Sequence, residues 1–275
     1  MRRATISLAA LALAICYAST LRGMAQQWWT DEDMGYGFVV PFVIAWIMWN
    51  ERAHWRKLPI QGTAWGFVVL AAAACLQIAS AFGAGLFAAS VALMLSLVGV
   101  VLATLGFAWL RAWAFPFVLT LFMLPKLAVV YNQVTLPLQL LATRLAGGML
   151  SAAGFLVVRD GNILTVAGHS ISVVEACNGI RYLLPLAFLA LVFAYAGGAQ
   201  AWIRVVMVAA AVPIAIVANA VRVAFSGLSP MLTSGTLHAV LGTVIFLLCL
   251  GSLAALYHLL ARAPGYNRIC KKPMS

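Results

Sequence analysis

The sequence predicts an all-α polytopic membrane protein with about eight transmembrane helices and a small external β-hairpin or meander before the sixth span. The first observation behind this fold class is composition: 65% of the 275 residues are hydrophobic and only 8% are charged. Soluble domains are about 45–50% apolar and about 25% charged, so this chain needs a bilayer around it. The second is that long apolar stretches recur along the chain, and the third is that this pattern is interrupted once, ahead of the sixth stretch.

A transmembrane helix needs roughly 20 predominantly apolar residues. We expect spans at about 5–24, 36–50, 62–81, 86–108, 112–131, 182–198, 203–224 and 238–260. The first follows two arginines, but no clean small-residue cleavage site comes after it, and Ile15 ahead of Cys16 does not fit a lipoprotein motif. We therefore expect a retained signal anchor. The whole chain, 1–275, is expected to form a single integral membrane domain.

The orientation of the spans follows from the 17 Lys and Arg residues, because cytoplasmic loops are enriched in these residues. A cytoplasmic N-terminus places most of them inside: Arg2, Arg3, Arg52, Arg56, Lys57, Arg111, Arg204, Arg262, Arg268, Lys271 and Lys272. Both termini are therefore expected in the cytoplasm. The net charge of +11 and the basic tail, 261–275, are explained by topology and by contact with anionic lipid rather than by nucleic-acid binding.

The interruption falls at about 132–176, which this topology places on the outer side. Residues 135–151 form an amphipathic stretch that is expected to lie along the membrane interface. Residues 154–175 contain short β-branched runs separated by Asp160-Gly161 and by Gly168, which are turn signals between strands. A small external β meander is therefore expected there.

Polar residues next to apolar spans need an explanation, because burying them is costly unless they are paired or hydrated. Three groups stand at the outer ends of consecutive antiparallel spans: Glu175, Cys177, Asn178 and Arg181 at the sixth, Asn219 and Arg222 at the seventh, and His238 at the eighth. Short connections between such helices make them neighbours, so the three groups are expected to converge at the outer membrane face.

Cys177 is the one cysteine of five that the topology places outside, since Cys16, Cys75 and Cys249 fall in spans and Cys270 in the basic tail. A membrane cysteine is often just a small buried hydrophobic residue. Here the thiol stands at a helix N-terminus and one turn from Arg181, and both features stabilise a thiolate. We therefore interpret Cys177 as a reactive thiol.

Arg222 and His238 each have a structural explanation as well. An arginine near a helix end can extend to the lipid headgroups, and a lone histidine can lie at the membrane interface with its hydrogen bonds formed. One Cys and one His fall short of a zinc site. A thiol, a guanidinium and an imidazole at one face are instead the groups of acyl transfer, in which they serve as nucleophile, charge stabiliser and proton carrier.

Three motifs in this order resemble the exosortase/archaeosortase family of polytopic membrane transpeptidases: residues 174–181 (VEACNGIR), residues 219–223 (NAVRV) and the downstream His238. Further similarity lies in residues 35–41 (GYGFVVP) and the basic 49–52 that follow, in 122–125 (FMLP), and in Asp160-Gly161. The likeness covers about 34–258. Many members have His-Gly where this chain has Tyr36-Gly37, so this position is not counted as catalytic.

The resemblance implies a sorting enzyme of the bacterial inner membrane, often in bacteria that make exopolysaccharide. Such an enzyme recognises a PEP-CTERM-like signal, made of a Pro-Glu-Pro motif, an apolar helix and a basic cluster at the C-terminus of its substrate proteins. It cuts at the motif through a thioacyl enzyme and passes the protein to an acceptor nucleophile. Matched motifs make Cys177 the nucleophile, Arg222 the stabiliser of the oxyanion or thiolate and His238 the proton-transfer residue, with support from Glu175, Asn178, Arg181 and Asn219.

No cofactor, metal or nucleic acid is expected. The partners are substrate proteins, an acceptor and the bilayer. Two alternatives stay open: a thiol endopeptidase that resolves the acyl enzyme with water, and a non-enzymatic transporter or exopolysaccharide-export component.

Overall fold

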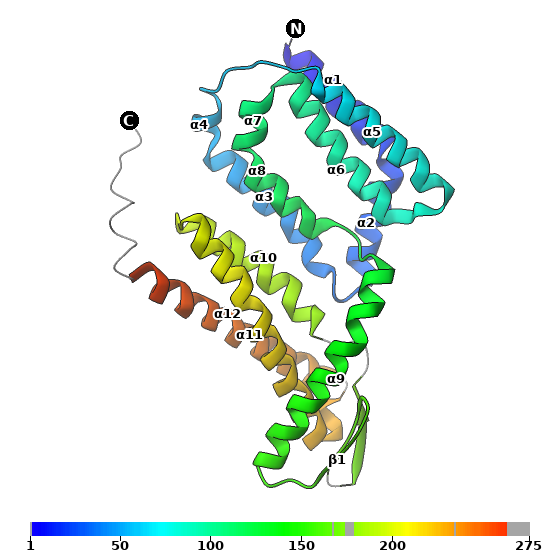
Figure 1. Ribbon diagram of the computed structural model, residues 1–275, viewed down its shortest axis with the longest axis vertical. Helices are drawn as coiled ribbons and strands as arrows, with labels where there is room; N and C mark the ends of the chain where they lie inside the picture. Colours follow the sequence, from blue (N-terminus) through cyan, green and yellow to red (C-terminus); the bar gives the residue numbers. More distant parts are fainter. Residues whose placement is uncertain (1, 167, 174–178, 234, 263–275) are drawn as a thin grey trace. The chain divides into compact units, whose positions relative to one another are not determined.

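The structure is a computed structural model that describes residues 2–166, 168–173, 179–233 and 235–262 (Figure 1). It is mainly helical and carries one three-stranded sheet, as the sequence predicts, and each expected apolar stretch contains helix. The chain forms two compact units, Met1–Leu127 and Ala128–Ser275, which are described one at a time.

Four helices in the described part of the chain are long and apolar enough to cross a membrane. They are Trp65–Gly83, Gly85–Thr104, Ala201–Leu228 and Gly235–Arg262, and a broken pair, Ala114–Met123 with Ala128–Ala152, counts as a fifth if it forms one span. A multi-pass membrane protein is therefore confirmed. The number of eight spans stays a prediction, because the remaining apolar helices are shorter.

The first unit consists of helices joined by tight connections. Its elements are α1 (Arg2–Cys16), α2 (Ala18–Thr30), the 3-10 helix η1 (Gly35–Phe38), α3 (Val39–Asn50), α4 (Arg52–Trp55), α5 (Trp65–Ala79), the π-helical turn η2 (Ser80–Ala84), α6 (Gly85–Thr104), α7 (Phe107–Ala112), α8 (Ala114–Thr120) and the 3-10 helix η3 (Leu121–Met123). Helix α1 is separated from α2 at Tyr17, whose hydroxyl hydrogen-bonds Ser96 of α6 at 2.8 Å.

The expectation of one continuous helix over 112–131 is wrong. The helix ends at Met123, and Leu124 is extended with φ −64° and ψ 137°. The cause is Pro125, because the proline ring excludes the helical conformation from the residue before it. The chain resumes as helix only at Ala128.

The second unit combines four helices with the sheet. Its elements are α9 (Ala128–Ala152), β1 (Val157–Asp160), β2 (Ile163–Val166), β3 (His169–Ser172), α10 (Ile180–Ala196), α11 (Ala201–Leu228), the 3-10 helix η5 (Pro230–Leu232) and α12 (Gly235–Arg262). The expected amphipathic stretch 135–151 lies within α9, where the buried residues recur every three or four positions.

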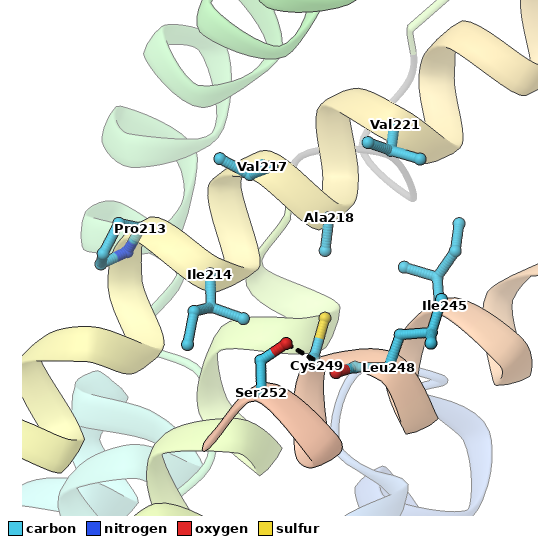
Figure 2. Close-up of a pocket in the computed structure, with 9 residues that line it drawn as sticks. All are labelled: Pro213, Ile214, Val217, Ala218, Val221, Ile245, Leu248, Cys249 and Ser252. Atoms are coloured by element: carbon cyan, nitrogen blue, oxygen red, sulfur yellow. Dashed lines mark hydrogen bonds between the residues drawn. The ribbon is translucent and has the colours of Figure 1, made fainter. Parts of the chain in front are cut away.

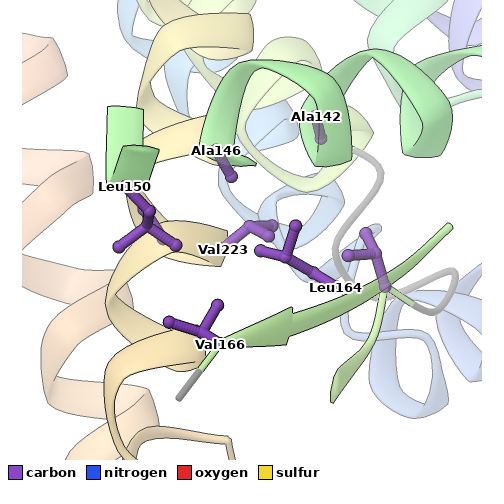
Figure 3. Packing of buried hydrophobic residues seen from close by; sticks show 8 residues of the cluster. Ala142, Ala146, Leu150, Leu164, Val166 and Val223 are labelled. Carbon is purple, nitrogen blue, oxygen red and sulfur yellow. The ribbon is translucent and has the colours of Figure 1, made fainter. Parts of the chain in front are cut away.

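The strands form an antiparallel meander in the order β1-β2-β3, and β2 pairs Leu164 with Ile171 of β3. Alternation places Leu164 and Val166 on one face of β2, where both are fully buried. Figure 3 shows them packed against α9 and against Val223 of α11. The cluster consists of Ala142, Ala146, Leu150, Leu164, Val166, Val173, Val223 and Ala224, with Val157 and Ile171 against it.

The pairing of the meander extends one residue beyond β3. The Val173 amide donates to the Asn162 carbonyl at 2.8 Å, and the Asn162 side-chain amide donates to the Val173 carbonyl at 3.1 Å. Val173 is itself buried in the cluster. The sheet thus anchors the chain on α9 and α11 immediately before residues 174–178, which include the cysteine motif and lie outside the described residues.

Helices α11 and α12 enclose an apolar groove of about 390 Å³ (Figure 2). Ile214 and Ala218 of α11 are directed toward Cys249 and Ser252 of α12. The groove extends from Pro213 along α11 to Val221. It therefore ends beside residue 222.

Candidate active site

Helix α11 carries a buried polar stripe. Asn219, Arg222 and Ser226 follow one another at spacings of three and four residues, which places them on one face of the helix. Their exposed fractions are 2%, 2% and 6%. Because an isolated charge inside a protein is costly, the stripe must be matched by polar groups on the neighbouring elements.

The main partner of the stripe is His238, in the first turn of α12. Arg222 Nη2 lies 2.5 Å from His238 Nε2. Helices α11 and α12 are joined by only a short connection containing η5, and this brings the end of one next to the start of the other. The structure thus unites two of the three residues that the resemblance marks as catalytic.

The second ring nitrogen of His238 fixes the tautomer. Nδ1 lies 2.7 Å from the carbonyl oxygen of Leu232, and a carbonyl only accepts, so Nδ1 carries the proton. Arginine only donates, so Nε2 accepts from Arg222. His238 is therefore neutral in this arrangement, and the lone pair that could take up a proton is held by Arg222.

Ser226 completes this network. Its hydroxyl donates to the same Leu232 carbonyl at 3.1 Å, so one backbone oxygen accepts from both Ser226 and His238. Neither Ser226 nor Leu232 is among the candidate residues predicted from the sequence. Ser226 could have been found from its position four residues after Arg222, whereas a backbone carbonyl leaves no sign in the sequence.

The start of α10 lies against the polar stripe. Gly179 precedes the helix with φ +85°, a left-handed conformation that favours glycine, and a methyl group there would lie 3.4 Å from Asn219 Cβ. Arg181 is the second residue of α10 and is half-buried. Asn219 therefore borders the end of the cysteine motif, whereas Glu175, Cys177 and Asn178 themselves lie outside the described residues.

Tyr182 is a further residue of the site that the sequence analysis missed. It is the third residue of α10, is 4% exposed, and places its ring 5.6 Å from the Arg222 guanidinium carbon. Its neighbour Arg181 was selected for its charge, and an aromatic residue in an apolar helix gave no comparable signal.

A second polar cluster lies within the first unit. Lys126 Nζ contacts Asp31 Oδ1 at 2.8 Å and Asp33 Oδ2 at 2.7 Å, and all three side chains are largely shielded from solvent. The acidic loop and the residue after Pro125 thus form one ion-bridged group. Within the described ranges, no three His, Cys, Asp or Glu residues cluster as metal ligands.

The apolar helices and the hydrogen-bonded pair of buried Arg222 and partly buried His238 define a class: an integral membrane protein with a polar cluster between helix ends. Comparison with known families narrows this class. The family model for transmembrane exosortases matches residues 28–255. The chain therefore belongs to the transmembrane exosortase family. Searches of curated proteins and of solved structures gave no match.

Proposed function

We propose that this protein is a membrane cysteine transpeptidase that cleaves a C-terminal PEP-CTERM-like sorting signal and transfers the protein to an acceptor nucleophile. Family membership supports a membrane transpeptidase-type sorting role. The observation that carries the finer proposal is the Arg222–His238 hydrogen bond, which pairs a buried cation with a neutral imidazole of defined tautomer. Gly179 supports it, because the cysteine motif enters α10 against the same polar stripe.

In the proposed reaction the Cys177 sulfur attacks the scissile carbonyl carbon. The thiol proton passes to His238 Nε2, which then gives it to the leaving nitrogen as the peptide C–N bond breaks. The product of this step is a thioacyl enzyme and a released C-terminal peptide. A nucleophile of the acceptor then attacks the thioester carbon and gives its proton to His238 Nε2. The C–S bond breaks, and His238 passes this proton to the Cys177 sulfur, which restores the thiol.

Arg222 changes partners in this scheme. Before reaction its Nη2 occupies His238 Nε2, so the imidazole cannot take up a proton. The oxyanion that develops on the scissile carbonyl attracts the guanidinium, since charge-assisted hydrogen bonds are the stronger ones. As Arg222 turns to the oxyanion, Nε2 becomes available to the thiol proton. Proton transfer is thus coupled to the development of the oxyanion.

The apolar helix of the substrate is proposed to lie along the groove between α11 and α12. The groove is lined by apolar side chains and ends at Val221, next to Arg222. A helix docked there would bring the segment that precedes it to the Arg222–His238 end. We place this end at the outer face of the inner membrane, with both termini in the cytoplasm.

The test is Cys177→Ala in membranes that hold a substrate protein with a Pro-Glu-Pro tail. We expect processing to be lost while the variant inserts at the level of the parent. Cys75→Ala, at an exposed position of α5, serves as the matched thiol control with processing retained. Normal processing by Cys177→Ala would remove the nucleophile assignment. Mass spectrometry of the new C-terminus then distinguishes an acceptor adduct, expected for transpeptidation, from a free carboxylate, which indicates hydrolysis.

The sidedness is tested separately with a membrane-impermeant thiol reagent. A variant that keeps Cys177 and replaces Cys16, Cys75, Cys249 and Cys270 by Ala is treated in intact cells with a permeabilised outer membrane. We expect labelling at Cys177 from the periplasmic side. Labelling from the cytoplasmic side alone contradicts both the topology and the acyl-transfer scheme.

A further inference from the structure

Tyr182 and Arg222 form a cation–aromatic contact between α10 and α11. The Arg222 guanidinium carbon lies 5.6 Å from the centre of the Tyr182 ring, within the range in which an aromatic face attracts a cation. Both residues are buried, at 4% and 2% exposed. Water therefore screens the contact little, and the attraction is stronger than at a protein surface.

The Tyr182 ring is itself held by α12. Phe246 stacks on it with ring centres 6.5 Å apart and planes inclined by 21°. Gly242 lies one turn before Phe246, and a methyl group there would come within 3.3 Å of the Tyr182 hydroxyl and 3.9 Å of the Arg222 guanidinium carbon. The Tyr182 hydroxyl and the guanidinium thus lie directly beside Gly242, where a methyl group would be in tight contact with the hydroxyl.

We infer that Tyr182 is a positioning residue that holds the Arg222 guanidinium in contact with His238. An arginine side chain has many rotamers, and the hydrogen bond to Nε2 fixes one nitrogen of the guanidinium. The ring face restrains the planar group as a whole, and Phe246 restrains the ring. The inference rests on the proposed function only where it concerns processing.

The same two helices contain a reference pair. Arg204 of α11 lies over the Tyr195 ring of α10 at 4.7 Å, at the opposite end of both helices. Arg204 also donates to the Ala199 carbonyl at 3.0 Å. Tyr195→Leu removes a half-buried contact of the same kind between α10 and α11, away from His238, so it controls for loss of helix packing alone.

The first readout is chemical and needs no substrate. Diethyl pyrocarbonate modifies an imidazole nitrogen with a free lone pair, and in this protein Arg222 occupies Nε2 of His238. In purified full-length protein we expect Tyr182→Leu to raise the rate of His238 carbethoxylation by about two- to thirtyfold, the factor that corresponds to a cation–aromatic contact. Tyr182→Phe and Tyr195→Leu keep the parent rate. The exposed His169, followed by mass spectrometry in the same samples, corrects for reagent concentration.

An unchanged rate at His238 in Tyr182→Leu overturns the inference, and so does an equal increase in Tyr195→Leu. If Tyr182→Leu does not accumulate in the membrane, Phe246→Leu takes its place, because it leaves Tyr182 intact and removes only the ring behind it. A faster His238 reaction in Phe246→Leu supports the inference, and an unchanged rate overturns it.

The second readout is processing. We expect Tyr182→Leu to slow processing by about two- to thirtyfold, because a guanidinium that the ring no longer holds in the site is less often placed to reach the oxyanion. Tyr182→Phe keeps the ring face and should stay within twofold of the parent. The two readouts separate two failures. Faster carbethoxylation with unchanged processing keeps Tyr182 as the positioning residue of Arg222 and removes Arg222 from the proposed reaction. An unchanged rate of His238 carbethoxylation in Tyr182→Leu rules out Tyr182 as the positioning residue, whatever the result with Cys177→Ala.

Discussion

The two ring nitrogens of His238 can be tested one at a time with His238→Asn and His238→Gln. The side-chain amide of Asn reaches the position of Nδ1, so it can still donate to the Leu232 carbonyl but offers nothing to Arg222. The longer side chain of Gln reaches the position of Nε2, so its oxygen can still accept from Arg222 but Leu232 loses its donor. Neither amide takes up a proton near neutral pH.

The network sets the size of each effect. His238→Asn removes a hydrogen bond from a charged group, which contributes about 1.5–3 kcal/mol, whereas His238→Gln removes a neutral one, which contributes about 0.5–1.5 kcal/mol. The free energy of unfolding should therefore fall further for Asn than for Gln. Processing should fall by roughly a hundred- to ten-thousandfold in both, because general acid–base catalysis is lost in both.

The measurements are thermal unfolding of the purified protein in detergent and processing of a reconstituted substrate. His169→Gln, at an exposed position of β3, is the control and should leave both quantities unchanged. Processing within tenfold of the parent in His238→Gln would refute the proton-transfer role. A stability order with Gln below Asn would refute the assignment of donors and acceptors.

Two further predictions concern the scaffold. Leu164→Ala empties a fully buried position between β2, α9 and α11 and should lower the free energy of unfolding by about 2–5 kcal/mol. The control is Ile163→Ala, at an exposed position on the other face of β2. In the same unfolding experiment it should change the free energy of unfolding by less than about 1 kcal/mol. Equal losses would contradict the register of the sheet. Lys126→Met leaves Asp31 and Asp33 without their shared cation and should destabilise the first unit by about 1–3 kcal/mol, since the three side chains are largely, but not fully, shielded from solvent. In the double variant Lys126→Met/Asp31→Asn, part of the lost free energy of unfolding should return. Lys57→Met, at an exposed position, is the control. No recovery in the double variant would show that repulsion between the two carboxylates is not the cause.

Most of the fold could be predicted from composition and periodicity. The apolar stretches mark the helices, and the Asp160-Gly161 and Gly168 turns mark the meander, which the structure confirms. The break after Met123 was missed because mean hydropathy barely registers a single proline, although Pro125 acts on the backbone of Leu124. Hydropathy finds segments that prefer lipid and does not reveal where the backbone can continue as helix.

The site could be predicted only where charge marks it. Asn219, Arg222 and His238 are conspicuous in an apolar chain, and topology places them at neighbouring helix ends. Tyr182 and Ser226 are ordinary residues in such helices, and their importance comes from packing against Arg222 and Leu232. The Leu232 contribution is a main-chain atom, so the identity of the side chain carries no information about it.

Because a backbone carbonyl accepts the hydrogen bond from His238 Nδ1, the residue types in this loop can vary, but the length of the loop cannot. In a Ser-His-Asp triad the carboxylate that orients the histidine is lost with one substitution. A peptide oxygen survives every side-chain exchange at position 232, and what matters is its distance along the chain, six residues after Ser226 and six before His238. Relatives that keep this geometry should tolerate many residue types at this position but no insertion or deletion between α11 and α12. The length of the connection between α11 and α12, rather than its sequence, would then be the feature that relatives share.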